Sequence, residues 1–130
     1  MSQTNELEIM ERIALDLEGV EESLASSFNT GAEDFNALIR PLSAAGGKRL
    51  RAQLCLLIAN AGTSVERQRI RIAEAVEMLH LATLIHDDVL DQAEIRRGED
   101  TIHMHKGNKV AILSGDYLFA KAFQIVSEMP

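Results

Sequence analysis

Residues 65–92 read VERQRIRIAEAVEMLHLATLIHDDVLDQ, and this stretch decides the fold class. It is rich in Leu, Ala, Ile, Met and Glu, which favour helices, so it predicts the longest helix of the chain. Apolar residues dominate its second half, which we therefore expect to be largely buried. Because the whole chain holds only two prolines and few β-branched runs, we predict an all-α protein.

Other segments predict the helices that surround this one. Helical periodicity over residues 5–26 indicates an amphipathic packing helix, and a short helix is expected at 35–43, where Pro41 leaves its course open. Residues 48–61 follow the double glycine Gly46-Gly47 and are apolar almost all round, which predicts a buried helix. Residues 98–109 are expected to form a loop, and residues 110–128 a final helix.

Length and charge bound the possible functions. A chain of 130 residues suffices for one domain with a modest core, but it is short for a helical domain that encloses a deep cavity. The net charge of −7 argues against a nucleic-acid binder, which would need clustered Lys and Arg. The single cysteine, Cys55, allows no intrachain disulfide and no zinc set, and we expect it to be a small buried hydrophobe.

The sequence also bears on localisation. No apolar run is expected to reach the ~20 residues of a membrane span, and the N-terminus is acidic where a signal peptide would be basic. We therefore expect a cytoplasmic protein without stable membrane insertion. A substrate with an apolar tail could still bring it to a membrane surface.

Three polar side chains share one face of the long helix. His80, Asp87 and Asp91 lie seven and four residues apart, within a stripe of ~40° at ~100° per residue, and Asp88 lies ~100° to the side at its edge. Acids four residues apart repel each other unless a cation lies between them. Mg²⁺ commonly binds one or two carboxylates together with substrate phosphates. The pattern thus predicts a magnesium–diphosphate site, and the alternative is a solvated acidic face.

Basic residues near this stripe are candidates for binding a second anion. Arg96 and Arg97 follow the acids, and Lys48, Arg49 and Arg51 open the helix after the double glycine. A helix N-terminus flanked by cations is a favourable phosphate site. Alternatively, these are surface cations paired with nearby Glu.

The histidines are weak metal candidates. His103 and His105, even with His86, lack further ligands at convincing spacing, so no zinc site is expected. His86 is better explained as a packing residue or as one that supports the acids.

The motifs GGKRLR (46–51), EMLHLATLIHDDVLDQAEIRRG (77–98) and GNKVAILSGDYLFAKAFQ (107–124) occur in this order. With them the chain resembles the trans-type polyprenyl diphosphate synthases over residues 42–124, and most closely the bacterial heptaprenyl and octaprenyl enzymes. The resemblance implies that residues 1–130 are the N-terminal helices of a single isoprenoid-synthase-type bundle.

The resemblance implies a role for each site residue. Asp87, Asp88 and Asp91 would form the first aspartate-rich motif, binding Mg²⁺ that bridges to an allylic prenyl diphosphate, which Arg96 would also contact. In the family, the allylic diphosphate leaves, isopentenyl diphosphate attacks the carbocation, and a proton is lost. The residues implied to hold isopentenyl diphosphate are Lys48, Arg51, His80 and Arg97.

Small residues before the acids bear on product length. Ala82 and Thr83 stand where bulky aromatics stop chain growth early in this family, which suggests a product longer than farnesyl. The alternative is that they serve helix packing.

The chain also departs from the family pattern. Ala52 stands where Pro usually follows GGKRxR, which touches nothing catalytic. No second DDxxD occurs, so we expect a fragment of a longer synthase that is inactive alone, with uncovered apolar faces that favour a homodimer or another oligomer. The alternatives are a non-catalytic or regulatory subunit of a heteromeric synthase and a fragment of a class I terpene cyclase.

Overall fold

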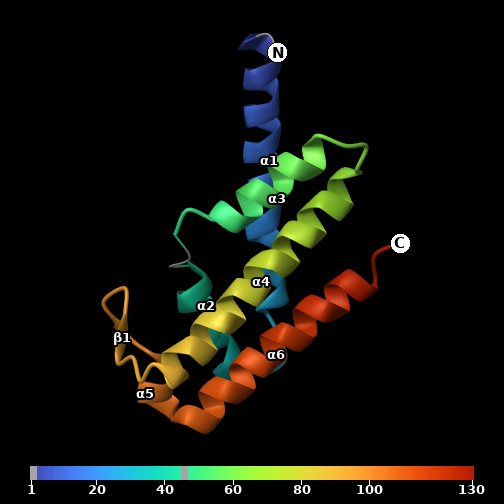
Figure 1. Ribbon diagram of the computed structural model, residues 1–130. Helices are drawn as coiled ribbons and strands as arrows, with labels where there is room; N and C mark the ends of the chain where they lie inside the picture. Colours follow the sequence, from blue (N-terminus) through green and yellow to red (C-terminus); the bar gives the residue numbers. More distant parts are fainter. Residues whose placement is uncertain (1–2, 45–46) are drawn as a thin grey trace.

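The computed structural model describes residues 3–44 and 47–130, and within them it is helical apart from one small hairpin (Figure 1). The all-α prediction is confirmed. The elements are α1 Gln3–Ser27, α2 Glu33–Ala44, α3 Leu50–Asn60, α4 Glu66–Leu90, β1 Ile95–Arg96, β2 Glu99–Asp100, α5 Ile102–Lys106 and α6 Asn108–Ser127.

Helix α4 lies at the centre of the structure. Figure 1 shows α6 running antiparallel beside it, while α3 and α1 pack along its other sides. Apolar side chains at helical spacing meet there and exclude water, which is the main favourable contribution to folding. The largest fully buried side chains include Leu24 of α1 and Phe28 just after it, Leu56 of α3, Met78 and Leu81 of α4, and Leu118 and Ile125 of α6.

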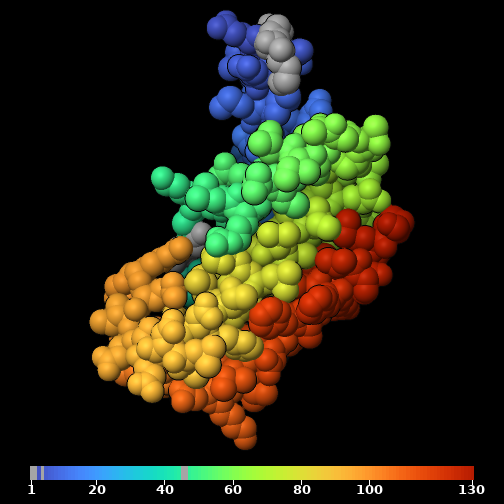
Figure 2. Space-filling view, viewed as in Figure 1, coloured from blue at the N-terminus to red at the C-terminus, as the bar shows by residue number. Residues whose placement is uncertain are grey.

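Helix α1 confirms the predicted amphipathic helix. Its second half supplies buried residues such as Val20 and Leu24. Its first half projects beyond the other helices, as the space-filling view shows (Figure 2). There Leu7 and Met10 are exposed.

Helix α3 corrects a prediction. We expected it to be buried, but only Ala52 and Leu56 are, while Leu54, Leu57 and Ile58 are at least half exposed. The sequence is apolar on every face, yet in the described part of the chain α3 packs chiefly on α1 and α4, along one side.

The predicted loop at 98–109 is also corrected, since it contains β2, α5 and the start of α6. Ile95 pairs with Asp100 and Arg96 with Glu99, through a two-residue turn in which Arg97 has φ 52° and Gly98 has φ 81°. Positive φ at both positions characterises the type I′ turn, whose twist suits a hairpin. The hydroxyl of Thr101 donates to the carbonyl of Ala93 at 2.8 Å and closes the base of the hairpin.

Helix α6 contradicts the expectation that no apolar run of the chain reaches the length of a membrane span. By length and composition alone, its 20 residues are long and apolar enough to cross a membrane, with a mean hydropathy of 1.2. It is nevertheless a packing helix in this structure, because Ala111, Leu118 and Ile125 are buried against its neighbours.

Two buried ion pairs tie α1 and its neighbours to α4. Near the start of α4, Arg69 donates to Asp16 of α1 at 2.9 Å, which raises the pKa of Arg69 through that hydrogen bond. Toward the middle of α4, Arg49 lies 3.5 Å from Glu77.

Candidate functional site

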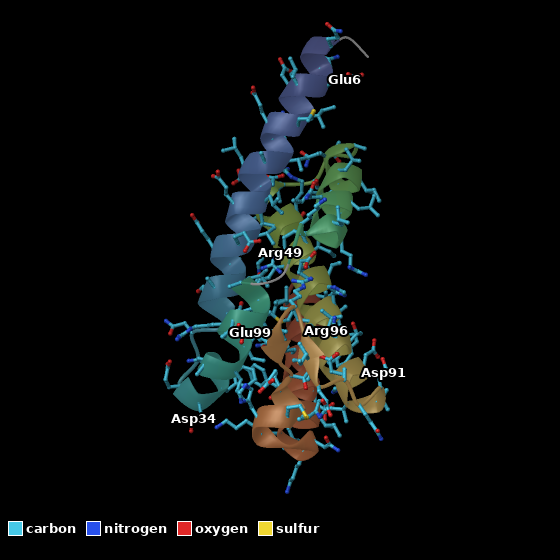
Figure 3. All side chains as sticks on the ribbon, turned by 90° about the vertical axis from the view of Figure 1, so that its left-hand side faces the viewer. Glu6, Asp34, Arg49, Asp91, Arg96 and Glu99 are labelled. Carbon is cyan, nitrogen blue, oxygen red and sulfur yellow. The ribbon has the colours of Figure 1, made fainter. Side chains whose placement is uncertain are left out.

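The predicted acidic stripe lies at the C-terminal end of α4. Asp87 and Asp91 are both exposed, and the N–H of Asp91 donates to the carbonyl of Asp87 at 2.8 Å. His80, two turns earlier, is half-buried. Figure 3 shows Asp91 where α4 ends. The two carboxylates thus lie on a face that no other described helix covers.

Asp88 is placed differently from its neighbours. It is buried, and both of its carboxylate oxygens accept hydrogen bonds from Arg96 of β1, at 2.6–3.0 Å. The pKa of Arg96 is raised, first by the hydrogen bond to Asp88 and further by the negative charges of Asp88, Asp87 and Asp91. Burial opposes this effect but does not cancel it. The hairpin therefore holds the Arg96 guanidinium beside the acidic end of α4, where Figure 3 labels it.

Arg51 and His80 are in direct contact, with Arg51 Nη1 3.2 Å from His80 Nε2. A guanidinium can only donate, so Nε2 accepts and the imidazole is neutral with its proton on Nδ1. The pKa of His80 is lowered, first by burial and then by the Arg51 charge. The pair therefore presents a fixed cation backed by a neutral histidine.

Arg97 and Lys48 lie at the same end of the molecule. The Arg97 guanidinium packs on Gly47, where an added β-carbon would lie 3.3 Å from its Nη2, and Gly47 itself has φ 69°. Lys48 is exposed next to it, and its carbonyl accepts from the Gln53 side chain. Gly46, the other residue of the double glycine, lies outside the described residues. The cations of the GGKRLR segment and of the hairpin are thereby brought together.

Arg49 is not available for an anion, contrary to the expectation that it joins Lys48 and Arg51. It is only 6% exposed and donates to Glu21, to the carbonyl of Ser43 at 2.6 Å and to Glu77. Glu77 was not predicted from the sequence as a residue that supports the site. A lone carboxylate within the apolar run EMLHLA signals a need for a partner, but nothing local identifies that partner.

The two small residues proposed to affect product length are separated. Ala82 is fully buried in the core, whereas Thr83 is exposed one turn before Asp87 and donates to the carbonyl of His80 at 2.7 Å. Thr83 alone thus shares the open face with Asp87. The role of both in product length stays a prediction.

A cavity of about 330 Å³ lies between α2, α4, the hairpin and α5. Its apolar wall includes Leu38, Leu84, Ile85 and Ile102. Its polar wall includes His80, Asp88, Arg96 and Arg97. Glu77, Glu99, Asp100, Arg49 and Lys106 also line the cavity, so its polar wall carries charges of both signs.

The described residues contain no group of three or more His, Cys, Asp or Glu side chains able to hold a metal ion by themselves. His86 instead packs against Phe119 and lies 3.0 Å from the carbonyl of Ile112, in agreement with a packing role. Asp87 and Asp91 therefore supply only part of the ligand set that a metal at the acidic end of α4 would need.

The matches to known proteins agree with this arrangement. Residues 32–130 match the family model described as polyprenyl synthetase. The chain belongs to the polyprenyl synthetase family. It is 34% identical over 121 residues to octaprenyl diphosphate synthase of Escherichia coli, covering 93% of this chain and 38% of that protein.

Solved structures of the polyprenyl synthetase family also superpose on the chain. A polyprenyl synthase from Caulobacter crescentus, complexed with calcium and isoprenyl diphosphate, gives a TM-score of 0.83 at 36% identity, with 91% of this chain and 37% of that one covered. Heptaprenyl diphosphate synthase from Staphylococcus aureus gives 0.82 at 30% identity, with 88% and 37% covered. The chain spans about a third of the length of the curated relatives it matches.

Proposed function

We propose that the chain is the N-terminal part of a trans-polyprenyl diphosphate synthase, which condenses an allylic prenyl diphosphate with isopentenyl diphosphate. The observation that carries the proposal is that Arg51 of α3 contacts His80 of α4. The C-terminal end of that same α4 carries the exposed Asp87 and Asp91. Two anion-binding groups of different character, one cationic and one suited to a metal, suit a reaction between two diphosphates.

Asp87 and Asp91 fit a magnesium site. They are hard oxygen donors four residues apart, and their exposure leaves room for water and substrate phosphates, which Mg²⁺ prefers to a complete protein cage. When bound, the metal supplies electrostatic stabilisation of the departing diphosphate. Asp88, with both oxygens bonded to Arg96, is assigned here to holding that arginine, and a metal contact from Asp88 would compete with this pair.

The chain's own residues then bind and orient the substrates. Arg96 donates to the allylic diphosphate from its place beside Asp88, and its permanent charge offsets negative charge as the diphosphate departs. Isopentenyl diphosphate is held at the cationic end of α3. The residues assigned to it are Lys48, Arg51, His80 and Arg97.

The apolar wall of the 330 Å³ cavity and the small Thr83 suit prenyl tails, and a product longer than farnesyl is the expectation.

The exposed apolar residues of α3 and α6 favour a homodimer or another oligomer, and a cytoplasmic location is proposed. Terpene cyclases do not bind isopentenyl diphosphate, so the cation group also argues against that alternative.

Binding measurements test the assignment of the two substrates. We expect isothermal titration of the chain to show Mg²⁺-dependent binding of an allylic diphosphate that Asp87→Ala weakens. Isopentenyl diphosphate is expected to bind even in the presence of a chelator, and Arg51→Gln to weaken it. Equal allylic binding without Mg²⁺ and in Asp87→Ala would contradict the metal assignment.

A turnover assay tests the fragment interpretation. The chain mixed with both diphosphates and Mg²⁺ is expected to form no product, because no second aspartate-rich motif occurs in the sequence. Product formation would show that these residues alone complete the site. Absence of all diphosphate binding would instead favour the regulatory-subunit alternative.

A further inference from the structure

Arg49 connects four segments of the chain through its side chain and backbone. Its guanidinium contacts Glu21 of α1, Ser43 near the end of α2 and Glu77 of α4, and its own backbone lies just before α3. The residue has φ 52°, in the left-handed region that is unfavourable for a side chain other than glycine. Figure 3 shows it between α1 and α4. These contacts fix one backbone conformation for the segment that carries Lys48 and Arg51.

Glu77 holds the other side of this connection. It is 2% exposed, and while one carboxylate oxygen lies near Arg49, the other accepts the N–H of Ala52 at 3.0 Å. The N–H of Ala52 belongs to the first turn of α3, where backbone donors have no partner within the helix. Arg49, as the residue before α3, supplies no side-chain cap. Glu77 therefore caps α3 from a different helix.

The two contacts of Glu77 bear directly on the cation group. Arg51 lies between Arg49 and Ala52 in the sequence, and His80 lies one turn after Glu77 on α4. The Arg51–His80 distance of 3.2 Å is thus set by the same two helices that Glu77 joins. A side chain that fixes the first turn of α3 against α4 also fixes the spacing of these two substrate contacts.

We propose that the buried Arg49–Glu77 pair is a positioning device, which holds Arg51 against His80 and so presets the cations for a diphosphate. The proposal rests on the proposed function of this cation group. Arg49 and Glu77 also line the cavity, but their charged atoms are engaged with each other and with α1, α2 and α3, so we assign them a positioning role. Their loss weakens isopentenyl diphosphate binding without changing the metal-dependent binding at Asp87 and Asp91.

The test measures both affinities in one set of variants of the chain. Glu77→Gln keeps the side-chain volume but removes the charge that faces Arg49. We expect affinity for isopentenyl diphosphate, measured in the presence of a chelator, to fall roughly tenfold, because misplacing a binding group by about 1 Å is costly. Mg²⁺-dependent binding of the allylic diphosphate is expected to stay within twofold, roughly 0.4 kcal/mol.

Arg69→Gln is the matched control. It breaks another buried ion pair, Asp16–Arg69, which joins α1 to α4 but lies far from the cations along α4. A general loss of stability would act alike in both variants, whereas positioning affects Glu77→Gln alone. The ¹⁵N shift of His80 Nε2 provides a second measurement, because it reports the Arg51 hydrogen bond and is expected to move in Glu77→Gln and not in Arg69→Gln.

Two further variants keep the test decisive if Glu77→Gln fails to fold. The double variant Arg49→Met with Glu77→Leu removes both charges together, which proteins often tolerate better than leaving one charge buried alone. Glu21→Gln changes only the half-exposed partner of Arg49 and is expected to fold with a smaller, roughly twofold loss of isopentenyl diphosphate affinity.

The outcomes separate this proposal from the function it rests on. Wild-type affinity for isopentenyl diphosphate in every folded variant would overturn the positioning role, and so would equal losses in Glu77→Gln and Arg69→Gln. If Arg51→Gln has no effect on isopentenyl diphosphate binding, the assignment of the cation group itself is wrong. A selective loss in the Arg49 and Glu77 variants supports both.

Discussion

His86 of α4 lies so close to Gly115 of α6 that a β-carbon on the glycine would overlap the imidazole ring. The same ring lies 3.0 Å from the carbonyl of Ile112 and 3.3 Å from Asp116. This contact sets the distance between the two helices immediately before Asp87. Gly115, which has no side chain, therefore allows α6 to pack closely against α4 next to its acidic end.

Gly115→Ala is expected to destabilise the chain. The new methyl group must displace His86 or separate α4 from α6, and such overpacking typically costs about 1–3 kcal/mol. Urea denaturation followed by circular dichroism measures the effect. Gly31→Ala is the control, because nothing lies within 4 Å of that position, and an equal loss there would show that helix separation is not the cause.

Asp88→Asn is expected to loosen the hairpin. The change removes the charge that receives three hydrogen-bond contacts from Arg96, and because Arg96 is about one-third exposed we expect a modest loss of about 1–2 kcal/mol. Hydrogen exchange of the Thr101 amide, which donates to Glu94 at the hairpin base, is expected to accelerate. Asp100→Asn on the exposed strand is the control, and faster exchange in it as well would contradict a specific Asp88 effect.

Asp87→Asn is expected to stabilise the metal-free chain slightly. Asp87 and Asp91 repel each other and also lie at the C-terminal end of α4, where the helix dipole disfavours negative charge. Removing one charge is expected to gain about 0.3 kcal/mol at low salt. Asp34→Asn in the first turn of α2 is the opposite control, since a negative charge there is favourable and its loss destabilises. A stability loss in Asp87→Asn would mean that the attraction between Asp87 and Arg96 outweighs both unfavourable effects.

His80 is expected to make stability depend on pH. Burial and then the Arg51 charge lower its pKa in the folded chain, so the unfolded chain, with the ordinary value near 6.5, binds the proton more readily. Stability is therefore complete above about pH 6.5 and falls as the pH decreases through the lowered pKa. Urea titrations between pH 7.5 and 5 are expected to show a smaller decrease in His80→Gln. The same decrease in both proteins would contradict the assignment.

The helices could be predicted from the sequence because their signals are local. The boundaries of α1, α4 and α6 lie within about two residues of the predicted ones, since apolar spacing and the glycines at 62 and 107 act over one or two turns. The prediction that α3 is buried was wrong, because burial depends on which neighbouring elements cover that helix. The hairpin was missed for a related reason, since an arginine at a positive-φ turn position gives no recognisable turn signal.

In the candidate site, too, local features could be predicted from the sequence and contacts between distant segments could not. The stripe of His80, Asp87 and Asp91 follows from the helical repeat, and the structure places the latter two on an open face. The inward orientation of Asp88 depends on Arg96 reaching back from the hairpin. The capping of Ala52 by Glu77 joins residues 25 positions apart, which periodicity cannot reveal. Local patterns thus identify the candidate site residues, whereas tertiary contacts determine which side chains hold them in place.

The turn residue Arg97 has an evolutionary consequence. Its left-handed backbone costs about 1–2 kcal/mol relative to glycine, so a glycine there would make the hairpin more stable. Selection for thermal resistance alone would therefore favour glycine at this position, whereas selection for the proposed binding of isopentenyl diphosphate would retain the arginine. A comparison of variants recovered under these two selections would show whether position 97 is optimised for thermal stability or for ligand binding.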